Sequence, residues 1–223
     1  MHVARTLSSF FAALFCISFS HTAVATSLNL LVLTHDKQVA ENIGVSFVPK
    51  FTLPEPYSST PPQPQIMDQQ NTQFVPHILM AQKGAPISFP NSDSVQHHVY
   101  SFSEAKTFEL KLYKDQKPEP LPFENEGTVT LGCNIHDWML GYVFVVDTPF
   151  FGKTNQSGLI TIELPKGEYE IAIHSPLLQK TDLNFKQTLQ VTNQGKQSMS
   201  ITLSDPLLPG LDQFDDVDEF DAY

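Results

Sequence analysis

One short stretch decides how the rest of the chain is interpreted: Gly132-Cys133-Asn134-Ile135-His136-Asp137-Trp138-Met139. It offers a thiol, an imidazole and a thioether in the order Cys-x-x-His-x-x-Met, and a histidine pair, His97-His98, lies upstream. A thiolate, two imidazoles and a weakly bound thioether are the ligands of a mononuclear copper site that exchanges one electron. We therefore predict one copper ion, cycling between Cu(I) and Cu(II), with His97, Cys133 and His136 in the plane and Met139 axial.

The histidine pair is expected to supply one ligand and not two. Successive side chains of a strand point to opposite faces, so His97 shares a face with Val99 and His98 shares the other with Tyr100. We assign His97 to the metal. His98 then becomes an outer group that orients a ligand by hydrogen bonding, or the alternative ligand, and Asn91 is a second candidate for either role.

The mature chain is predicted to be all-β. Apolar residues recur with period two, Gly, Pro and Asn interrupt them, and no stretch has a sustained helical repeat. So many short strands fit two small sandwiches better than one. The expected strands are 28–34, 43–48, 74–81, 86–90, 97–102, 108–113, 127–132, 141–147, 159–164, 167–174, 186–192 and 197–203.

The N-terminus has the pattern of a secretory signal. Arg5 is followed by an apolar stretch at 7–19 and by the small-residue motif Ala23-Val24-Ala25, which predicts cleavage after Ala25 (signal peptide 1–25) and a periplasmic protein. The apolar stretch is too short to span a bilayer stably, so we expect no membrane span. Cys16 leaves with the signal, which makes Cys133 the only cysteine of the mature chain.

A lone thiol in an oxidising compartment is a liability unless something occupies it. A metal ion would occupy it; the alternative is a buried cysteine acting as a small hydrophobe.

The chain carries 13 basic and 24 acidic residues, a net charge of −11, so nucleic acid is not an expected partner. Many of the acids lie in the tail 204–223, which we expect to be disordered and either simply solvated or a docking segment for a basic partner.

Two boundaries enclose all the candidate ligands. The proline-rich segment 53–65 is predicted to be a stiff linker, and a second boundary falls near 147. Between them lies a candidate metal domain, 66–147. We expect residues 28–52 and 148–203 to form one discontinuous sandwich into which this domain is inserted; in the competing arrangement, a simple tandem, the first two strands join the metal domain.

Two resemblances support this division. Residues 74–146 resemble a cupredoxin: Cys133-x-x-His136-x-x-Met139 has the short spacing of amicyanin-like members, and the turn from Asn91 to His97-His98-Val99 is similar to the family's Asn-rich turn followed by His-Asn-Val. This resemblance implies a Greek-key sandwich with a blue-copper (type 1-like) site, with His97 as ligand and His98 in the place of an outer-shell Asn. Gly132 stands where the family often has a bulkier residue, a departure that opens one side of the thiolate.

The other resemblance lies in the C-terminal half. Its alternating pattern, from Gly158 to Ile173 through Leu164-Pro165 and Gly167, resembles the second half of a transthyretin-like or carboxypeptidase-regulatory-like sandwich. Taken over most of the mature chain, the two modules together resemble the exported family named methylamine utilization proteins. That resemblance implies copper binding and electron transfer with a redox protein partner. The sequence carries no signal for the oligomeric state.

Three functions compete for the predicted site. The first is a periplasmic one-electron carrier. The second is a non-redox copper-binding protein for delivery or sensing, or a docking module for a membrane or oxidase partner. An enzyme is not expected, because four donors leave no open position for substrate, and zinc is disfavoured because a thioether does little for that ion. Trp138 either lies exposed beside the site, where a partner approaches, or closes the core.

Overall fold

The computed structural model describes residues 25–114, 117–192 and 195–210. Its elements are strands apart from one short helix, α1 (Lys180–Leu183), so the predicted all-β class is confirmed for the described chain. The predicted signal peptide lies outside the described residues except for Ala25, where the first strand begins. No helix among the described residues is long and apolar enough to cross a membrane.

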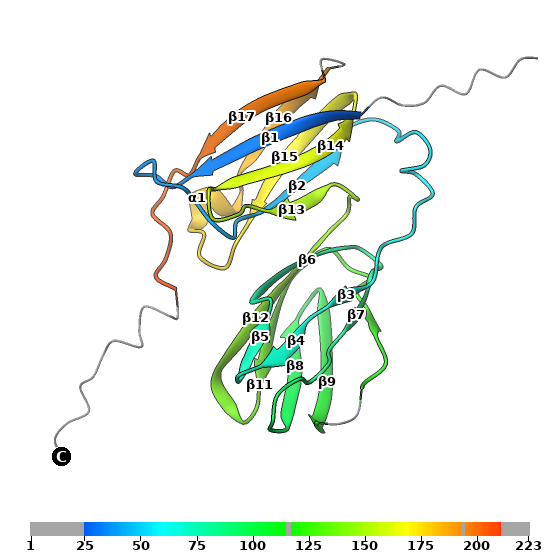
Figure 1. Cartoon of the computed structure of the whole chain (residues 1–223), viewed down its shortest axis with the longest axis vertical. Helices are drawn as coiled ribbons and strands as arrows, with labels where there is room; N and C mark the ends of the chain where they lie inside the picture. The colour runs from blue at the N-terminus through cyan, green and yellow to red at the C-terminus, as the bar shows by residue number, and fades with distance from the viewer. Residues whose placement is uncertain (1–24, 115–116, 193–194, 211–223) are drawn as a thin grey trace, which may run out of the picture.

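The upper sandwich in Figure 1 contains β1 (Ala25–Leu33), β2 (Gly44–Pro49) and the last five strands. One sheet has the order β14-β1-β17 and the other β13-β2-β15-β16. Along β1, Leu28, Leu30 and Val32 are buried and their neighbours are partly exposed, the alternation of a strand with one face on a core. The other strands are β13 (Phe151–Lys153), β14 (Leu159–Pro165), β15 (Gly167–His174), β16 (Lys186–Val191) and β17 (Lys196–Thr202).

The lower sandwich is formed by the intervening chain. Its main sheet has the order β6-β12-β11-β8-β9, and its inner face packs with the small sheet β10-β7-β3 around a core that includes Phe89, Phe123 and Leu131. The main-sheet strands are β6 (Ile78–Gln82), β8 (His97–Ser103), β9 (Lys106–Tyr113), β11 (Gly127–Cys133) and β12 (His136–Val146). The remaining strands are β3 (Gln65–Ile66), β4 (Asp68–Gln70), β5 (Gln73–Val75), β7 (Pro86–Ser88) and β10 (Leu121–Pro122).

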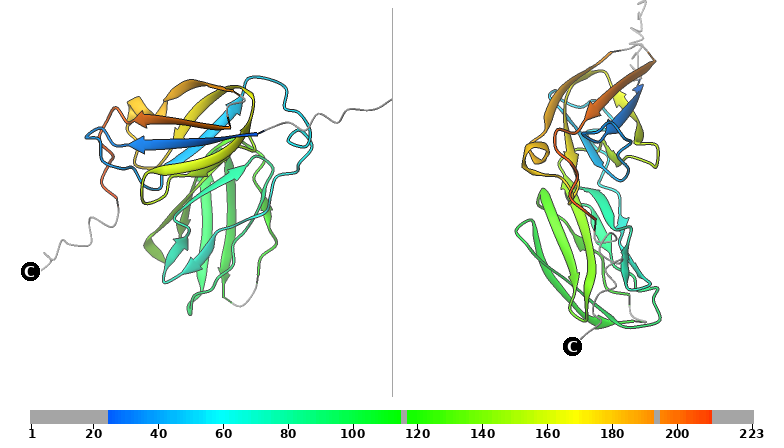
Figure 2. Two further views of the ribbon diagram at one scale, coloured as in Figure 1. Left: turned by 45° about the horizontal axis from the view of Figure 1, so that its top comes forward. Right: turned by 90° about the vertical axis from the view of Figure 1, so that its left-hand side faces the viewer.

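The two sandwiches lie one above the other, as the views in Figure 2 also show. Between them is an apolar cluster on the outer face of β6 and β12: Ile78, Met80, Phe144 and Val146. The ring of Phe144 lies 5.6 Å from that of His174 on β15, and the Lys153 ammonium donates a hydrogen bond of 2.7 Å to the Ile78 carbonyl. The lower sandwich therefore buries part of its outer face against the upper one.

Several strand boundaries differ from the sequence prediction. The expected strand 74–81 is two strands, β5 and β6, because Pro76 interrupts it and proline cannot donate to a ladder. Four very short strands, β3, β4, β10 and β13, were not predicted, since pieces of two or three residues carry no measurable periodicity. Strand β12 begins at His136, well before the predicted start at 141.

The segments expected to be a linker and a tail both contact the upper sandwich. The Tyr57 ring, in the proline-rich segment, lies 5.2 Å from Phe150 of the upper core. At the other end, the buried Asp182 carboxylate accepts hydrogen bonds from the backbone N–H groups of Ser204 and Asp205. Contacts therefore continue past the predicted boundary at 204, to a hydrogen bond from Leu208 N to Leu177 O; residues 211–223 lie outside the described chain.

Candidate metal centre

The predicted ligand loop is a tight hairpin. Cys133 ends β11 and pairs directly with His136, which begins β12, so only Asn134 and Ile135 form the turn. The register shifts between Gly132 and Cys133, and both residues are buried. A bulge of this kind re-aims a side chain relative to strict alternation. Cys133 keeps the inward alternation of Val129 and Leu131, and the extra residues of β12 allow His136 to pair with it although alternation from Met139 would place His136 on the other face.

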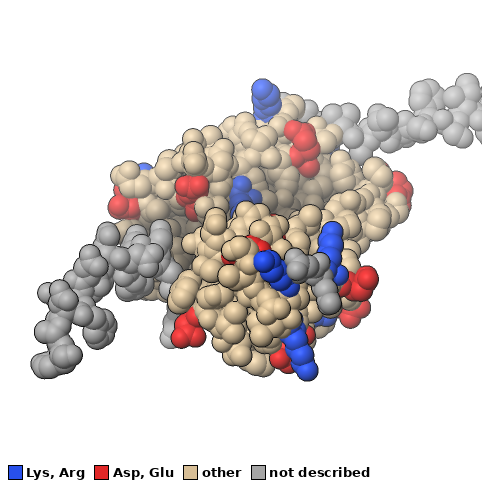
Figure 3. Space-filling view, turned by 60° about the horizontal axis from the view of Figure 1, so that its bottom comes forward, with Lys and Arg blue, Asp and Glu red and all other residues tan. Residues whose placement is uncertain are grey.

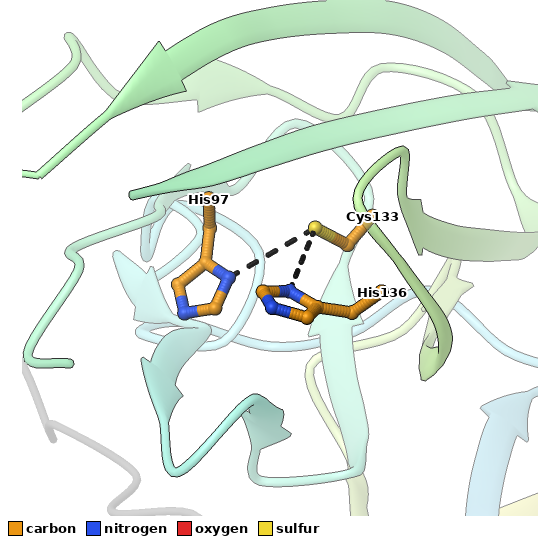
Figure 4. Close-up of side chains that lie close together, drawn as sticks. All are labelled: His97, Cys133 and His136. Atoms are coloured by element: carbon orange, nitrogen blue, oxygen red, sulfur yellow. Dashed lines mark hydrogen bonds between the residues drawn. The ribbon is translucent and has the colours of Figure 1, made fainter. Parts of the chain in front are cut away.

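Three of the predicted donors meet at the end of this hairpin. His97, at the start of β8, has its Nδ1 atom 3.9 Å from the Cys133 sulfur, and His136 has its Nδ1 atom 3.6 Å from the same sulfur (Figure 4). One donor atom from each residue lies within 4.8 Å of the others. His97 is fully buried, Cys133 is 4% exposed and His136 is half-buried. The cluster therefore opens toward solvent only on the His136 side.

The spacing of these atoms fits one ion between them. Metal–sulfur and metal–nitrogen bonds of about 2.3 and 2.0 Å, meeting at about 120°, would place the sulfur and each nitrogen about 3.7 Å apart. The two observed separations of 3.6 and 3.9 Å bracket this value. A soft thiolate beside imidazole nitrogens suits copper, so the residues present fit the predicted ion.

Met139 lies on the inner face of β12. Its side chain is 1% exposed and belongs to the same buried cluster as Cys133. Alternation along β12 places Met139, Gly141 and Val143 on this inner face and leaves Trp138 on the other. The structure thus places Met139 in the core beside the hairpin that carries the other two donors.

His98 and Asn91 have other partners. His98 lies on the opposite face of β8 from His97, and its Nε2 atom is 2.8 Å from the Glu109 carboxylate. The Asn91 amide donates to the carbonyls of Val95 and Tyr113, at 3.0 and 2.8 Å, and its oxygen accepts from the Asp93 N–H. Asn91 therefore fixes the loop before His97, and these hydrogen bonds use both its amide nitrogen and its oxygen.

Asp93 is the functional candidate that sequence reasoning missed. Its carboxylate oxygen lies 3.0 Å from His97 Nε2, the ring nitrogen that faces away from Cys133. The Thr72 backbone N–H and then the His97 hydrogen bond lower the pKa of Asp93 to about 2, so the carboxylate is ionised. An acid in a polar turn is ordinary in sequence, and only the fold brings this one to the imidazole.

The Tyr100 ring fills the space beside Gly132. Gly132 pairs with Tyr100 across β11 and β8, and a Cβ atom on the glycine would lie 2.8 Å from the phenol ring. Because Gly132 has no side chain, the Tyr100 ring lies next to the backbone beside Cys133. The space at Gly132 that was expected to leave one side of the thiolate open is therefore filled by Tyr100.

Trp138 does not close the core. Its side chain is 65% exposed, and its ring lies 5.5 Å from that of His136. Ile135, in the hairpin turn, is also exposed. Figure 3 brings forward the bottom of the view in Figure 1 and shows a surface there that is mostly uncharged, with a few charged side chains of both signs scattered over it. The half-buried imidazole is therefore bordered by apolar side chains that solvent can reach.

Comparison with known proteins found structural similarity alone. No protein-family model and no curated protein matched the sequence. The chain is similar to an amicyanin variant in its reduced Cu(I) form, at 17% identity over 46% of this chain and 98% of that one, with a TM-score of 0.35. It is also similar to a purple cupredoxin from Nitrosopumilus maritimus (26% identity, 37% and 99% covered, TM-score 0.31). A copper-containing nitrite reductase from Thermus scotoductus aligns at 18% identity over 43% of this chain and 25% of that one, with a TM-score of 0.36.

Proposed function

We propose that this protein binds one copper ion through His97, Cys133, His136 and Met139 and carries single electrons. The observation that supports it most is the convergence of one sulfur and two imidazole nitrogens, each nitrogen 3.6 or 3.9 Å from the sulfur, with His97 and Cys133 buried and His136 half-buried. Buried polar groups normally have hydrogen-bond partners. Among the residues that the structure describes, the Cys133 sulfur has two long contacts, both to imidazole nitrogens, and such spacing suits donors that share one ion.

The scaffold suits an ion that changes charge without moving its ligands. Cys133 and His136 are fixed as directly opposite partners in one hairpin, and His97 comes from β8, which pairs with β11 in the same sheet. Ligands held on strands are positioned more precisely than ligands on loops. Copper held in this way would supply reversible one-electron exchange, while the chain keeps the donors in place and buries the Cys133 side chain.

Electrons would enter and leave through His136. It is the one half-buried donor of the three, and the exposed side chains of Trp138 and Ile135 border it. A small apolar border lets a redox protein approach the imidazole closely without forming a long-lived complex, since contacts of this size are weak. We infer a periplasmic location from the predicted signal peptide, and in that compartment Cys133 without a metal would be open to oxidation.

The test is a titration of the purified mature protein with Cu(II), followed by visible absorption and electron paramagnetic resonance. We expect one ion per chain and an intense thiolate-to-copper charge-transfer band that Cys133→Ser abolishes. Met139→Leu is expected to keep the band and to alter its position and the reduction potential, because the weak axial ligand is lost. A reversible voltammetric wave would distinguish an electron carrier from a delivery or sensing protein.

A matched pair of histidine variants serves as the control. His97→Gln removes a donor that faces Cys133, whereas His98→Gln removes the neighbouring imidazole on the other face of β8. Loss of the band in the first and its retention in the second is the expected result. Binding that is indifferent to Cys133, or a band lost with His98 and retained without His97, contradicts the proposed site.

A further inference from the structure

We infer that Asp93 is a positioning residue for the metal centre: held by the turn between β4 and β5, it keeps a proton on His97 Nε2 and leaves the Nδ1 lone pair directed at the site. This inference deepens the proposed function and rests on it for its biological meaning. Its structural content, the state of one imidazole, can be measured in the metal-free protein.

The chemistry follows from the two nitrogens of His97. A neutral imidazole has one N–H donor and one lone-pair acceptor, and the partner of one nitrogen decides the state of the other. His97 Nε2 lies 3.0 Å from an Asp93 carboxylate oxygen, which can only accept, so the proton is on Nε2. Nδ1, 3.9 Å from the Cys133 sulfur, is then the atom with a free lone pair.

Asp93 is itself held by a separate part of the chain. The oxygen that accepts from His97 also accepts a 2.7 Å hydrogen bond from the backbone N–H of Thr72. Asn71 and Thr72 form the two-residue turn between β4 and β5, both with positive φ (52° and 57°), as a tight hairpin requires. The Asn91 oxygen and the Asp93 N–H fix the other side of the same residue at 2.9 Å.

The hairpin is also bonded to the loop that carries Asp93. Ser92 donates its N–H to the Gln69 carbonyl at 3.0 Å and its hydroxyl to the Asp68 carboxylate at 2.8 Å. The Gln69 amide donates to the Pro90 carbonyl at 2.9 Å. These bonds leave Asp93 little freedom to turn away from His97, so β4 and β5 form a brace for a ligand that they do not contain.

The same turn reaches the exposed side of the site. The Trp138 indole nitrogen lies 3.5 Å from the Thr72 hydroxyl, and its ring packs beside His136. The Thr72 backbone N–H therefore holds Asp93, which contacts the buried His97. The Thr72 hydroxyl contacts Trp138, which packs beside the half-buried His136. One turn outside the ligand hairpin braces both histidines of the predicted site.

The experiment compares Asp93→Ala and Asp93→Asn with wild type by nuclear magnetic resonance of the metal-free protein, reading the Hε2 proton and ring nitrogens of His97. Wild type is expected to show a downfield Hε2 that exchanges slowly with water. In Asp93→Ala this signal moves upfield and exchanges faster, and in Asp93→Asn it moves less, because a neutral oxygen is a weaker acceptor. Asp68→Ala, which frees Ser92, is expected to give a smaller change in the same direction.

Asp137→Asn is the matched control, because Asp137 is an exposed acid adjacent to His136 in sequence and its loss changes the charge equally. It should leave the His97 signals unchanged. With copper, Asp93→Ala is expected to bind about 10–100-fold more weakly than wild type, the usual cost of removing an outer partner of a metal-binding histidine.

An Hε2 signal that is the same in wild type and Asp93→Ala overturns the inference; if Asp93→Ala does not fold, an unchanged signal in Asp93→Asn does so. Failure of the proposed function gives a different result. Wild-type protein would then bind no copper through Cys133, while the His97 signals would still respond to Asp93.

Discussion

The two sandwiches bury polar side chains for different purposes. In the upper sandwich, the buried Thr154 hydroxyl donates to the Ala40 carbonyl and accepts from the Ile43 N–H, and the buried Thr148 hydroxyl donates to the Phe47 carbonyl. Each such group completes a backbone hydrogen bond that the strands leave open. In the lower sandwich, the buried Cys133 sulfur and His97 Nδ1 face each other at 3.9 Å.

This difference separates groups that hold a fold together from groups that are kept ready for a ligand. A buried polar atom without a good partner costs free energy, so a chain retains one only where something else compensates. In the upper sandwich, these buried threonine hydroxyls all have hydrogen-bond partners. In the lower one, the Cys133 sulfur and His97 Nδ1 have a long contact to each other, and they lie in the site whose exposed neighbour is Trp138. The same sheet-on-sheet architecture thus serves as support in one half and as a candidate metal centre in the other.

The largest effect is expected from a substitution in the core of the upper sandwich. Phe47 is fully buried in that core, and Phe47→Ala is expected to lower the free energy of unfolding by about 3–5 kcal/mol. The only tryptophan, Trp138, lies in the lower sandwich, so its fluorescence follows that half while circular dichroism follows both. Phe102→Ala, at an 82% exposed position, is the control and should change stability little.

If the sandwiches support each other only through the small cluster between them, the Trp138 transition moves far less than the circular dichroism transition in Phe47→Ala. A common shift of both transitions would show instead that the two halves unfold as one cooperative unit. Either result measures how much the packing of Phe144 against His174 couples the halves.

Copper should act on one half alone. Free copper at 100 times its dissociation constant stabilises the state that binds it by about 2.7 kcal/mol. We expect amide hydrogen exchange to slow in β11 and β12 and to stay unchanged in β1 and β15, which are in the other sandwich. Cys133→Ser serves as the control that removes the effect. Equal protection in both halves would contradict the division of roles drawn above.

The sequence predicted the chemistry of the site better than its surroundings. Cys133, His136 and Met139 lie in one short motif, and the alternation that separates His97 from His98 needs only a strand of ordinary length. Structure places His97 beside Cys133 and His98 on the other face. These are local patterns, which can be recognised in the sequence without knowledge of the fold.

The bracing residues could not be predicted in the same way. Asp93 and Thr72 are far apart in sequence and meet only because the β4–β5 hairpin packs on the turn before β8. The hairpin strands have three residues each, too few for a period to be read. The pairing of β1 with β14 and β17 likewise spans most of the chain. The resemblance of the upper sandwich to transthyretin-like modules stays a prediction.

Acid should weaken the contact between the halves. Burial lowers the pKa of His174, beside Phe144, from 6.5 to about 4, so the folded state favours the neutral ring. Because the folded pKa lies below the unfolded value, its contribution is complete above pH 6.5 and is lost as the pH falls toward 4. The full difference corresponds to about 3 kcal/mol, and partial exposure reduces it to about 2 kcal/mol. Denaturation of wild type and His174→Gln at pH 7 and 4.5 measures it: the pH dependence should shrink in the variant.

The smallest effect concerns the packing next to the thiolate. Gly132→Ala places a methyl group where the Tyr100 ring lies, and the ring must move outward. Because Tyr100 lies on the partly exposed outer face of β8, it can yield, and we expect a loss of about 1 kcal/mol, at the low end for overpacking. Tyr100→Ala should cancel that loss in the double variant, whereas two fully additive losses would show that the ring does not occupy this space. If copper binds Cys133, Gly132→Ala should also shift the charge-transfer band, because the altered contact is one residue from the sulfur. A substitution of Gly44, in the upper sandwich, is the control and should leave the band unchanged.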